Sequence, residues 1–269
     1  MIALLKFVQT KTQLPESGVK NTIQLLNDDC TIPFIARYRK ERTGNLDEVQ
    51  IELIVKYKEE FEALEKRKKA IIKALQEQEV LSNELQEKIN RSDNLIQLED
   101  LYLPFKKKRK TKAETARLNG LEPLAKIIMS QKAHDIDSIA KKYTSKTVLN
   151  IADALEGARF IIAEWINERS DIRNNIRRQL ERFSLINTKV VKAKENDEKA
   201  QKFRDYFNWT ESLQSCPSHR LLAILRAQEE GFIRVKIEID DEKALLKIEE
   251  RIISSQNDCS VQIQLAIKD

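Results

Sequence analysis

Apolar residues recur every three or four positions along most of the chain, the spacing that places them on one side of an α-helix. The longest such pattern covers residues 47–78 and predicts one helix about 45 Å long, at a rise of about 1.5 Å per residue. Because this length exceeds what one small hydrophobic core can cover, we expect the helix to connect two parts of the chain or to pack along another helix. Lys68 interrupts its apolar side. That side is formed by Ile54, Tyr57, Phe61, Leu64, Ile71 and Leu75.

Shorter helical patterns follow the long one. They cover residues 82–91, 94–102, 121–131 and 136–143, and a longer stretch, 148–183, that we expect to divide near Ser170. Alternating apolar and polar residues predict a β-strand over 232–239, with a second short strand near Val190. Two short strands do not form a stable sheet without a further partner, so the strand over 232–239 is expected to be poorly supported.

These patterns, with only five glycines and five prolines available for turns, predict a mainly α fold. We expect a multi-helix array with helix-turn-helix-like elements, one long helix and minor β-strand content. Residues 1–46 are expected to form an N-terminal helical segment and 47–80 the long connecting helix. Residues 81–230 are expected to form a central helical domain, and 231–269 a short strand with helices that lead to a downstream domain.

Residues 31–50, TIPFIARYRKERTGNLDEVQ, carry the local signals of a helix, a tight turn and a second helix. Pro33 suits a first helical turn, and Gly44 suits a left-handed C-cap. Asp47 is a candidate N-cap for the long helix, and Gln50 is placed to complete a capping box.

The first of these helices carries a cluster of cations. On a helical wheel, Phe34, Ile35 and Tyr38 fall together on an apolar side. Arg42 falls within the same arc, so we expect its stem to lie along the core and its head to meet a carboxylate or a carbonyl. The other cations either contact a polyanion or form the solvated side of the helix. They are Arg37, Arg39 and Lys40.

Charge is concentrated in one further segment, although 48 basic and 43 acidic residues leave a net charge of only +5. Closely spaced Lys and Arg neutralise phosphates and release counterions, the sequence-independent part of nucleic-acid affinity. Tyr102 and Phe105 precede the segment and are candidates for stacking on bases. The segment is alternatively an exposed loop between helices or, in a eukaryote, a nuclear-import signal. Its cations are Lys106, Lys107, Lys108, Arg109, Lys110 and Lys112.

Residue patterns typical of active sites are nearly absent. Cys30, Cys216 and Cys259 are far apart and form no CxxC pair, which argues against a disulfide framework and a zinc site and fits a reducing cytosol. Ser218 lies beside His219, but adjacent residues do not face each other on a helix. We expect Ser218 to cap a helix and His219 to make a structural hydrogen bond. The sequence also lacks phosphate-binding glycine loops and HExxH, so it predicts no catalytic residue, no metal site and no cofactor.

Targeting signals are not evident in the sequence. The N-terminal residues MIALLKFV are too short for a signal peptide, and no apolar run approaches the length of a membrane span. From this we expect a cytoplasmic protein with no membrane partner.

Five stretches resemble, in the same order, the N-terminal region of the Tex family of transcription accessory proteins. The resemblance extends over practically the entire chain. Lys107 stands where that family usually has proline, Phe160 where aspartate is usual, and Ala227 where glycine is usual. The stretches are TIPFIARYRKERTGNLDEVQ, LEDLYLPFKKKRKTKAETARLNGLEPLA, EGARFIIAE, FRDYF and PSHRLLAILRAQEEG.

The resemblance implies a cytoplasmic bacterial protein much longer than this chain. In such a protein an RNase-H-like domain, helix-hairpin-helix elements and a C-terminal OB-type RNA-binding domain follow this region, so the chain is expected to be its N-terminal helical part. A eukaryotic elongation factor that acts with RNA polymerase and chromatin has a similar helical region. The resemblance therefore implies a role in transcription through binding rather than through chemistry.

The resulting prediction is a non-catalytic helical module that contributes to binding of RNA or single-stranded DNA in transcription, through Arg37, Arg39, Lys40 and the six cations of 106–112. The alternative is a protein-interaction scaffold that contacts RNA polymerase or ribosome-associated partners without touching nucleic acid. A hydrolase ranks third, since it requires cleavage of RNA or DNA with Mg²⁺ or Mn²⁺ and no motif favours it.

Overall fold

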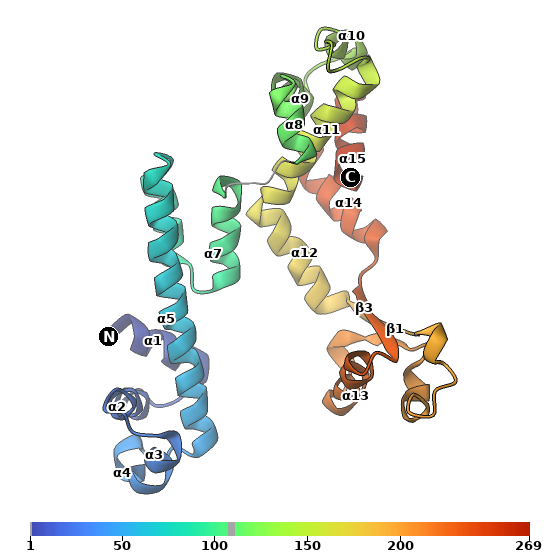
Figure 1. The fold of residues 1–269 in the computed structure, drawn as a ribbon. Helices are drawn as coiled ribbons and strands as arrows, with labels where there is room; N and C mark the ends of the chain where they lie inside the picture. The colour runs from blue at the N-terminus through green and yellow to red at the C-terminus, as the bar shows by residue number, and fades with distance from the viewer. Residues whose placement is uncertain (1, 107–110) are drawn as a thin grey trace. The chain divides into compact units, whose positions relative to one another are not determined.

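The computed structural model describes residues 2–106 and 111–269 (Figure 1). The chain divides into two compact units, Met1–Lys106 and Lys107–Asp269. Helices predominate among the described residues, and the β-structure found there is one small sheet, so the fold is mainly α as predicted. None of the described helices combines the length and the apolar character that crossing a membrane requires.

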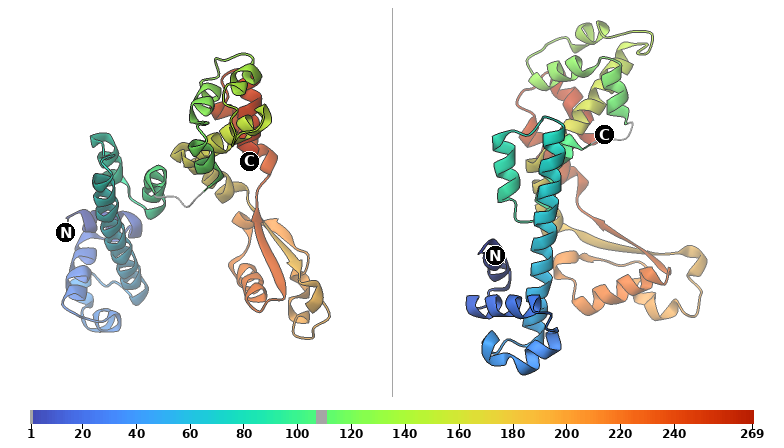
Figure 2. Two further views of the ribbon diagram at one scale, coloured as in Figure 1. Left: turned by 45° about the horizontal axis from the view of Figure 1, so that its top comes forward. Right: turned by 60° about the vertical axis from the view of Figure 1, so that its left-hand side comes forward.

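In the first unit, shorter helices pack along one long helix, α5 (Figure 2). Ile51 and Ile54 of α5 belong to a buried cluster with the helices that precede it, and Leu64 and Leu75 belong to a second cluster with the helices that follow. The long helix predicted over 47–78 is present as α5, and it packs against the helices on either side of it in the sequence. The helices are α1 (Ile2–Thr12), α2 (Glu16–Asn27), α3 (Ile32–Tyr38), α4 (Lys40–Thr43), α5 (Glu48–Glu77), α6 (Asn83–Arg91), α7 (Leu95–Tyr102) and the 3-10 turn η1 (Leu103–Phe105).

Lys68 interrupts the apolar side of α5 as predicted, yet its side chain is buried. Its Nζ donates to the Glu65 carboxylate at 2.9 Å and to the backbone oxygen of Asn90 at 3.0 Å. These acceptors replace the hydration that the ammonium loses, while its stem covers apolar surface. The interruption is thus accommodated by a carbonyl from a distant part of the sequence.

In the second unit, α11 is the central helix of a helical core (Figure 1). Its residues Ala158 and Ile162 are buried in one cluster with Ile263 and Ala266 of the much later helix α15. The predicted division near Ser170 is confirmed, because α11 ends just before it and α12 begins there. The helices of this core are α8 (Lys112–Leu118), α9 (Glu122–Ser130), α10 (Ile136–Lys141), α11 (Ile151–Glu168), α12 (Ser170–Phe183), α14 (Asp241–Ile252) and α15 (Asp258–Lys268).

A three-stranded antiparallel sheet of order β2-β1-β3 lies between α12 and α14 in the sequence. Its elements are β1 (Leu185–Val190), the 3-10 turns η2 (Lys192–Lys194) and η3 (Gln201–Tyr206), β2 (Thr210–Ser212), the 3-10 turn η4 (Leu213–Ser215), α13 (Ser218–Glu229) and β3 (Ile233–Glu238). The strand near Val190 is confirmed. The prediction that the strand over 232–239 is poorly supported is wrong, because β1 pairs with β3 from Leu185↔Glu238 to Val190↔Ile233. Ile224 and Ala227 of α13 are buried in the same cluster as Ile233.

The central position of β1 gives a testable pattern of hydrogen exchange. The amides of Thr188 and Val190 donate to the backbone oxygens of Trp209 and Phe207, at 2.8 Å and 2.7 Å. We expect these amides to exchange much more slowly than those of the exposed turn over 195–199, because their opening requires separation of the sheet. Equal exchange in both segments, measured by mass spectrometry or NMR, would contradict the sheet.

Candidate nucleic-acid interface

The first cationic cluster lies where α3 meets α4. Pro33 occupies the first turn of α3, and Gly44 ends α4 with a φ of 72°. Asp47 caps α5, since its carboxylate accepts from the Gln50 amide at 2.7 Å while the Gln50 side chain accepts from the Asp47 amide at 3.0 Å. The local signals read from the sequence are confirmed.

The helix is not continuous through this cluster, because Arg39 has a non-helical backbone with φ of −130° and ψ of 23°. A wheel drawn across that break misplaces Arg42, which is exposed rather than laid along the core. Thr43 is the residue that turns inward, with 1% of its surface exposed. Tyr38 was also expected on the apolar side, yet it is 67% exposed, because it ends α3 beyond the buried residue Ile35.

The three cations predicted to bind nucleic acid differ in their surroundings. Arg37 and Lys40 are exposed, and neither pairs with a carboxylate within the described part of the chain. Arg39 is half-buried. Its guanidinium lies 4.8 Å from the centroid of the Phe34 ring and donates to the Tyr38 backbone oxygen at 3.0 Å. Arg39 therefore contributes to the local fold, whereas Arg37 and Lys40 face solvent.

The second cationic segment is only partly described. Lys107, Lys108, Arg109 and Lys110 lie outside the described residues. Lys106 and Lys112 are exposed, and neither pairs with a carboxylate of residues 2–106 or 111–269. The Nζ atom of Lys112 lies 4.5 Å from the centroid of the Phe160 ring.

The two aromatic residues before this segment are partly buried by packing against neighbouring helices. Tyr102 and Phe105 are half-buried against the cluster shared by α5, α6 and α7. The guanidinium of Arg67 also lies 5.6 Å from the centroid of the Tyr102 ring. The packing leaves these rings less accessible to bases than the sequence suggested.

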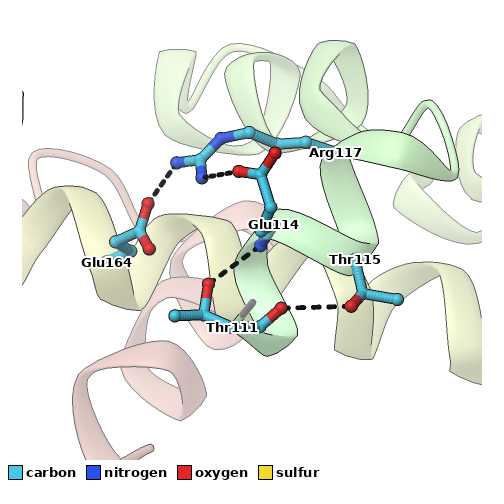
Figure 3. A network of polar contacts seen from close by, with 5 residues as sticks. All are labelled: Thr111, Glu114, Thr115, Arg117 and Glu164. Atoms are coloured by element: carbon cyan, nitrogen blue, oxygen red, sulfur yellow. Dashed lines mark hydrogen bonds and ion pairs between the residues drawn. The ribbon is translucent and has the colours of Figure 1, made fainter. Parts of the chain in front are cut away.

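A polar network joins Thr111, near the end of the second segment, to helices α8 and α11 (Figure 3). Thr111 caps α8 by accepting from the Glu114 amide at 3.1 Å, and the Thr115 hydroxyl donates to the Thr111 backbone oxygen at 3.1 Å. Arg117 then bonds to Glu164 of α11 and lies 3.5 Å from the Glu114 carboxylate. The network attaches α8 to α11.

Lys112 borders a groove of about 670 Å³ between the helices of the core. Arg173 and Arg177 of α12 line the same groove, over an apolar floor that includes Ile172 and Ile176. Arg173 donates to the Asn167 side chain at 3.0 Å, and Arg177 donates to that of Asn174 at 3.0 Å. These arginines were not among the predicted contact residues. The sequence feature that could have identified them is their spacing of four residues in RSDIRNNIRRQLER, which places both on one side of a helix.

Ser218 and His219 do not form a catalytic pair in the structure. Ser218 does not cap α13, because Pro217 holds the N-cap position and Ser218 is already helical. His219 is exposed and makes no side-chain hydrogen bond within the described residues, so both expectations for this pair are wrong. Burial raises the pKa of the Cys216 thiol, aided by the nearby Glu211 carboxylate, which opposes formation of a thiolate. Across residues 2–106 and 111–269, no three His, Cys, Asp or Glu side chains are grouped to hold a metal ion.

Comparison with known families accounts for most of the chain. Residues 2–76 match the family described as Tex-like protein N-terminal domain, and residues 131–268 match the family described as Tex central region-like. The chain belongs to the Tex family. The resemblance found in the sequence motifs is thereby confirmed.

Individual Tex relatives show the same relationship. The transcriptional accessory protein Tex of Neisseria gonorrhoeae is 39% identical over 219 residues, which cover 81% of this chain and 29% of that protein. The protein YdcI of Bacillus subtilis is 38% identical over 247 residues, covering 91% of this chain and 34% of that protein. The human S1 RNA-binding domain-containing protein 1 is 28% identical over 244 residues, covering 88% of this chain and 24% of that protein. The chain therefore spans about a third or less of the length of these relatives.

The groups of cations lie in different parts of the chain relative to the two matched ranges. The cluster at 37–42 lies in the Tex-like N-terminal domain, and the arginines of α12 lie in the Tex central region. The segment 106–112 lies between the two matched ranges.

Proposed function

We propose that the chain is a non-catalytic module of a Tex-like transcription accessory protein in the cytoplasm, and that it binds RNA or single-stranded DNA weakly and without sequence preference. The observation that carries the proposal is the exposure of Arg37 and Lys40 with no carboxylate partner among the described residues. Such cations are available to neutralise phosphates. The name of the human relative, which refers to RNA binding, adds support. The proposed contact residues are Arg37, Arg39, Lys40, Lys106, Lys107, Lys108, Arg109, Lys110 and Lys112.

The salt dependence of binding tests this proposal. Single-strand affinity falls with salt by a slope of about 0.7 per phosphate contact, so four lysines that contact phosphates account for a slope of nearly 3. We expect replacement of Lys106, Lys107, Lys108 and Lys110 with Gln to reduce the slope by about 2 or more. Fluorescence anisotropy with labelled oligo-U and oligo-dT, from about 50 to about 200 mM salt, measures this.

A matched variant separates a site from general charge. Lys132, Lys141, Lys142 and Lys146 are all exposed, and their replacement with Gln removes the same total charge. We expect this control to keep the slope of the parent chain. A slope that falls equally in both variants, or in neither, would show that the segment 106–112 is not a phosphate-binding site. Circular dichroism should show unchanged helix content in both variants.

The non-catalytic part of the proposal has its own measurement. The labelled strands should stay intact when incubated with the chain and Mg²⁺ or Mn²⁺, at the level of a buffer control. Reproducible cleavage that co-purifies with the protein would contradict a non-catalytic module and would indicate a hydrolase.

A second candidate function is a scaffold for RNA polymerase or ribosome-associated proteins. The observation that favours it is a groove of about 800 Å³ between α12 and α14. Phe183, Leu185 and Leu246 line it and are 67%, 41% and 55% exposed. Exposed apolar side chains gathered in a groove are typical of protein-interaction surfaces. This function predicts capture of such proteins with no dependence on the lysines of 106–112.

A further inference from the structure

Tyr38 is the exposed aromatic residue of the first cationic cluster. It is 67% exposed, whereas Ile35 in the same helix is fully buried. A tyrosine ring contributes little to the stability of the fold when most of its surface remains in water, since burial is the source of that contribution. Its ring at the end of α3 is therefore accessible to a ligand.

The Tyr38 ring is held in position by its neighbours. Its centroid lies 5.5 Å from that of Phe34, with the ring planes tilted by 43°. The Phe34 ring is in turn contacted by the Arg39 guanidinium at 4.8 Å. A ring held in this way loses less conformational freedom on binding than a ring on a free side chain.

The backbone around the ring is also constrained. Asn21 of α2 donates to the Arg42 backbone oxygen at 2.7 Å. A Cβ atom added to Gly18 would lie 2.6 Å from the Thr43 backbone oxygen, so α2 and α4 are in close contact. The cations that flank Tyr38 in the sequence thus extend from a constrained backbone.

The charge around the ring is strongly positive. Residues 37–42 contain four cations and one carboxylate, Glu41. Arg37, Lys40 and Arg42 are exposed and unpaired with carboxylates in the described structure. An aromatic face among cations is the arrangement that proteins use for single-stranded nucleic acid, in which a base stacks on the ring and the adjacent phosphates meet the cations.

We infer that Tyr38 is a stacking platform for one base of single-stranded nucleic acid, with Arg37 and Lys40 contacting the flanking phosphates. The inference rests on the proposed nucleic-acid binding and names the place where a base is held. It is independent of the segment 106–112, which lies outside both matched ranges. Charge complementarity alone would also suit an acidic protein, but a stacking platform requires a base.

Replacement of Tyr38 by leucine tests the inference, because it keeps apolar bulk and removes the π face. We expect Tyr38→Leu to weaken binding of oligo-U or oligo-dT by roughly 5- to 20-fold, the lower part of the range for loss of one stacked base. The slope of affinity against salt should remain that of the parent chain, since no phosphate contact is lost. Tyr38→Phe retains the ring and should bind within about 2-fold of the parent.

Two controls make the result specific. Phe183, which follows Arg182 at the end of α12, is also 67% exposed. Phe183→Leu therefore removes an equally exposed ring, and we expect it to leave the affinity for the single strand unchanged. On a strand of abasic sites, the parent chain and Tyr38→Leu should bind equally. Circular dichroism should show that Tyr38→Leu keeps the fold, as expected for an exposed position.

The outcomes separate the two proposals. If the parent chain binds but Tyr38→Leu binds equally well, or loses affinity equally on the abasic strand, the stacking platform is wrong while nucleic-acid binding stands. If the parent chain binds neither single strand, both proposals are overturned.

Discussion

Replacement of Gly157 with valine is expected to lower the free energy of unfolding of the second unit by about 3 kcal/mol, the cost of overpacking a closely packed core. A Cβ atom at Gly157 would lie 2.3 Å from a methyl carbon of Leu121 and 3.4 Å from the Cβ atom of Ala116. Leu121 is 1% exposed, so its side chain has little room to move. The glycine in the family motif EGARFIIAE thus allows α11 to approach α8 and α9.

Tryptophan fluorescence is a suitable probe, because both tryptophans, Trp165 and Trp209, lie in the second unit. Urea unfolding should show an earlier midpoint for Gly157→Val. Ala152→Val places the same side chain on an exposed position of α11 and should change stability by less than about 1 kcal/mol. A midpoint for Gly157→Val equal to that of the parent would show that the two helices are not in this contact.

Replacement of Leu98 with alanine is expected to destabilise the first unit by about 3 kcal/mol, through lost burial and the cavity left behind. Leu98 of α7 is fully buried in the cluster that contains Leu64 and Leu75 of α5. This cluster attaches α6 and α7 to the long helix. The variant should therefore release those helices before the remainder of the unit unfolds.

Far-UV circular dichroism should report this loss, while tryptophan fluorescence of the second unit keeps its midpoint. Ile96 lies on the same helix but is 58% exposed, so Ile96→Ala is the matched control and should change stability by less than about 1 kcal/mol. If both variants behave alike, α7 does not pack through Leu98.

Local signals in the sequence were sufficient for many element boundaries. Pro33, Gly44, Asp47 and Gln50 act on neighbouring residues, so their effects follow from spacing alone. The long helix and the division near Ser170 were also predictable, because the apolar period is a property of consecutive residues.

Features that depend on distant contacts were not predictable in this way. The support of β3 comes from β1, whose residues are about fifty positions away. The burial of Lys68 depends on a carbonyl of another helix. Arg42 was misplaced because one non-helical residue, Arg39, changes the direction of the side chains that follow. For the candidate site, the cations were visible in the sequence, but the exposure of Tyr38 and the groove lined by Arg173 were not.

The position of the sheet within the sequence has a consequence for synthesis of the chain. The helical core contains α11 and α15, but the residues of the sheet are translated between them. On the ribosome, the apolar side of α11 remains incompletely covered until α15 has emerged, whereas β1 and β3 are able to pair earlier. Because contacts between distant residues form slowly, the core is the later of the two to close. We therefore expect the sheet to fold before the helical core, whose helices lie on both sides of it in the sequence.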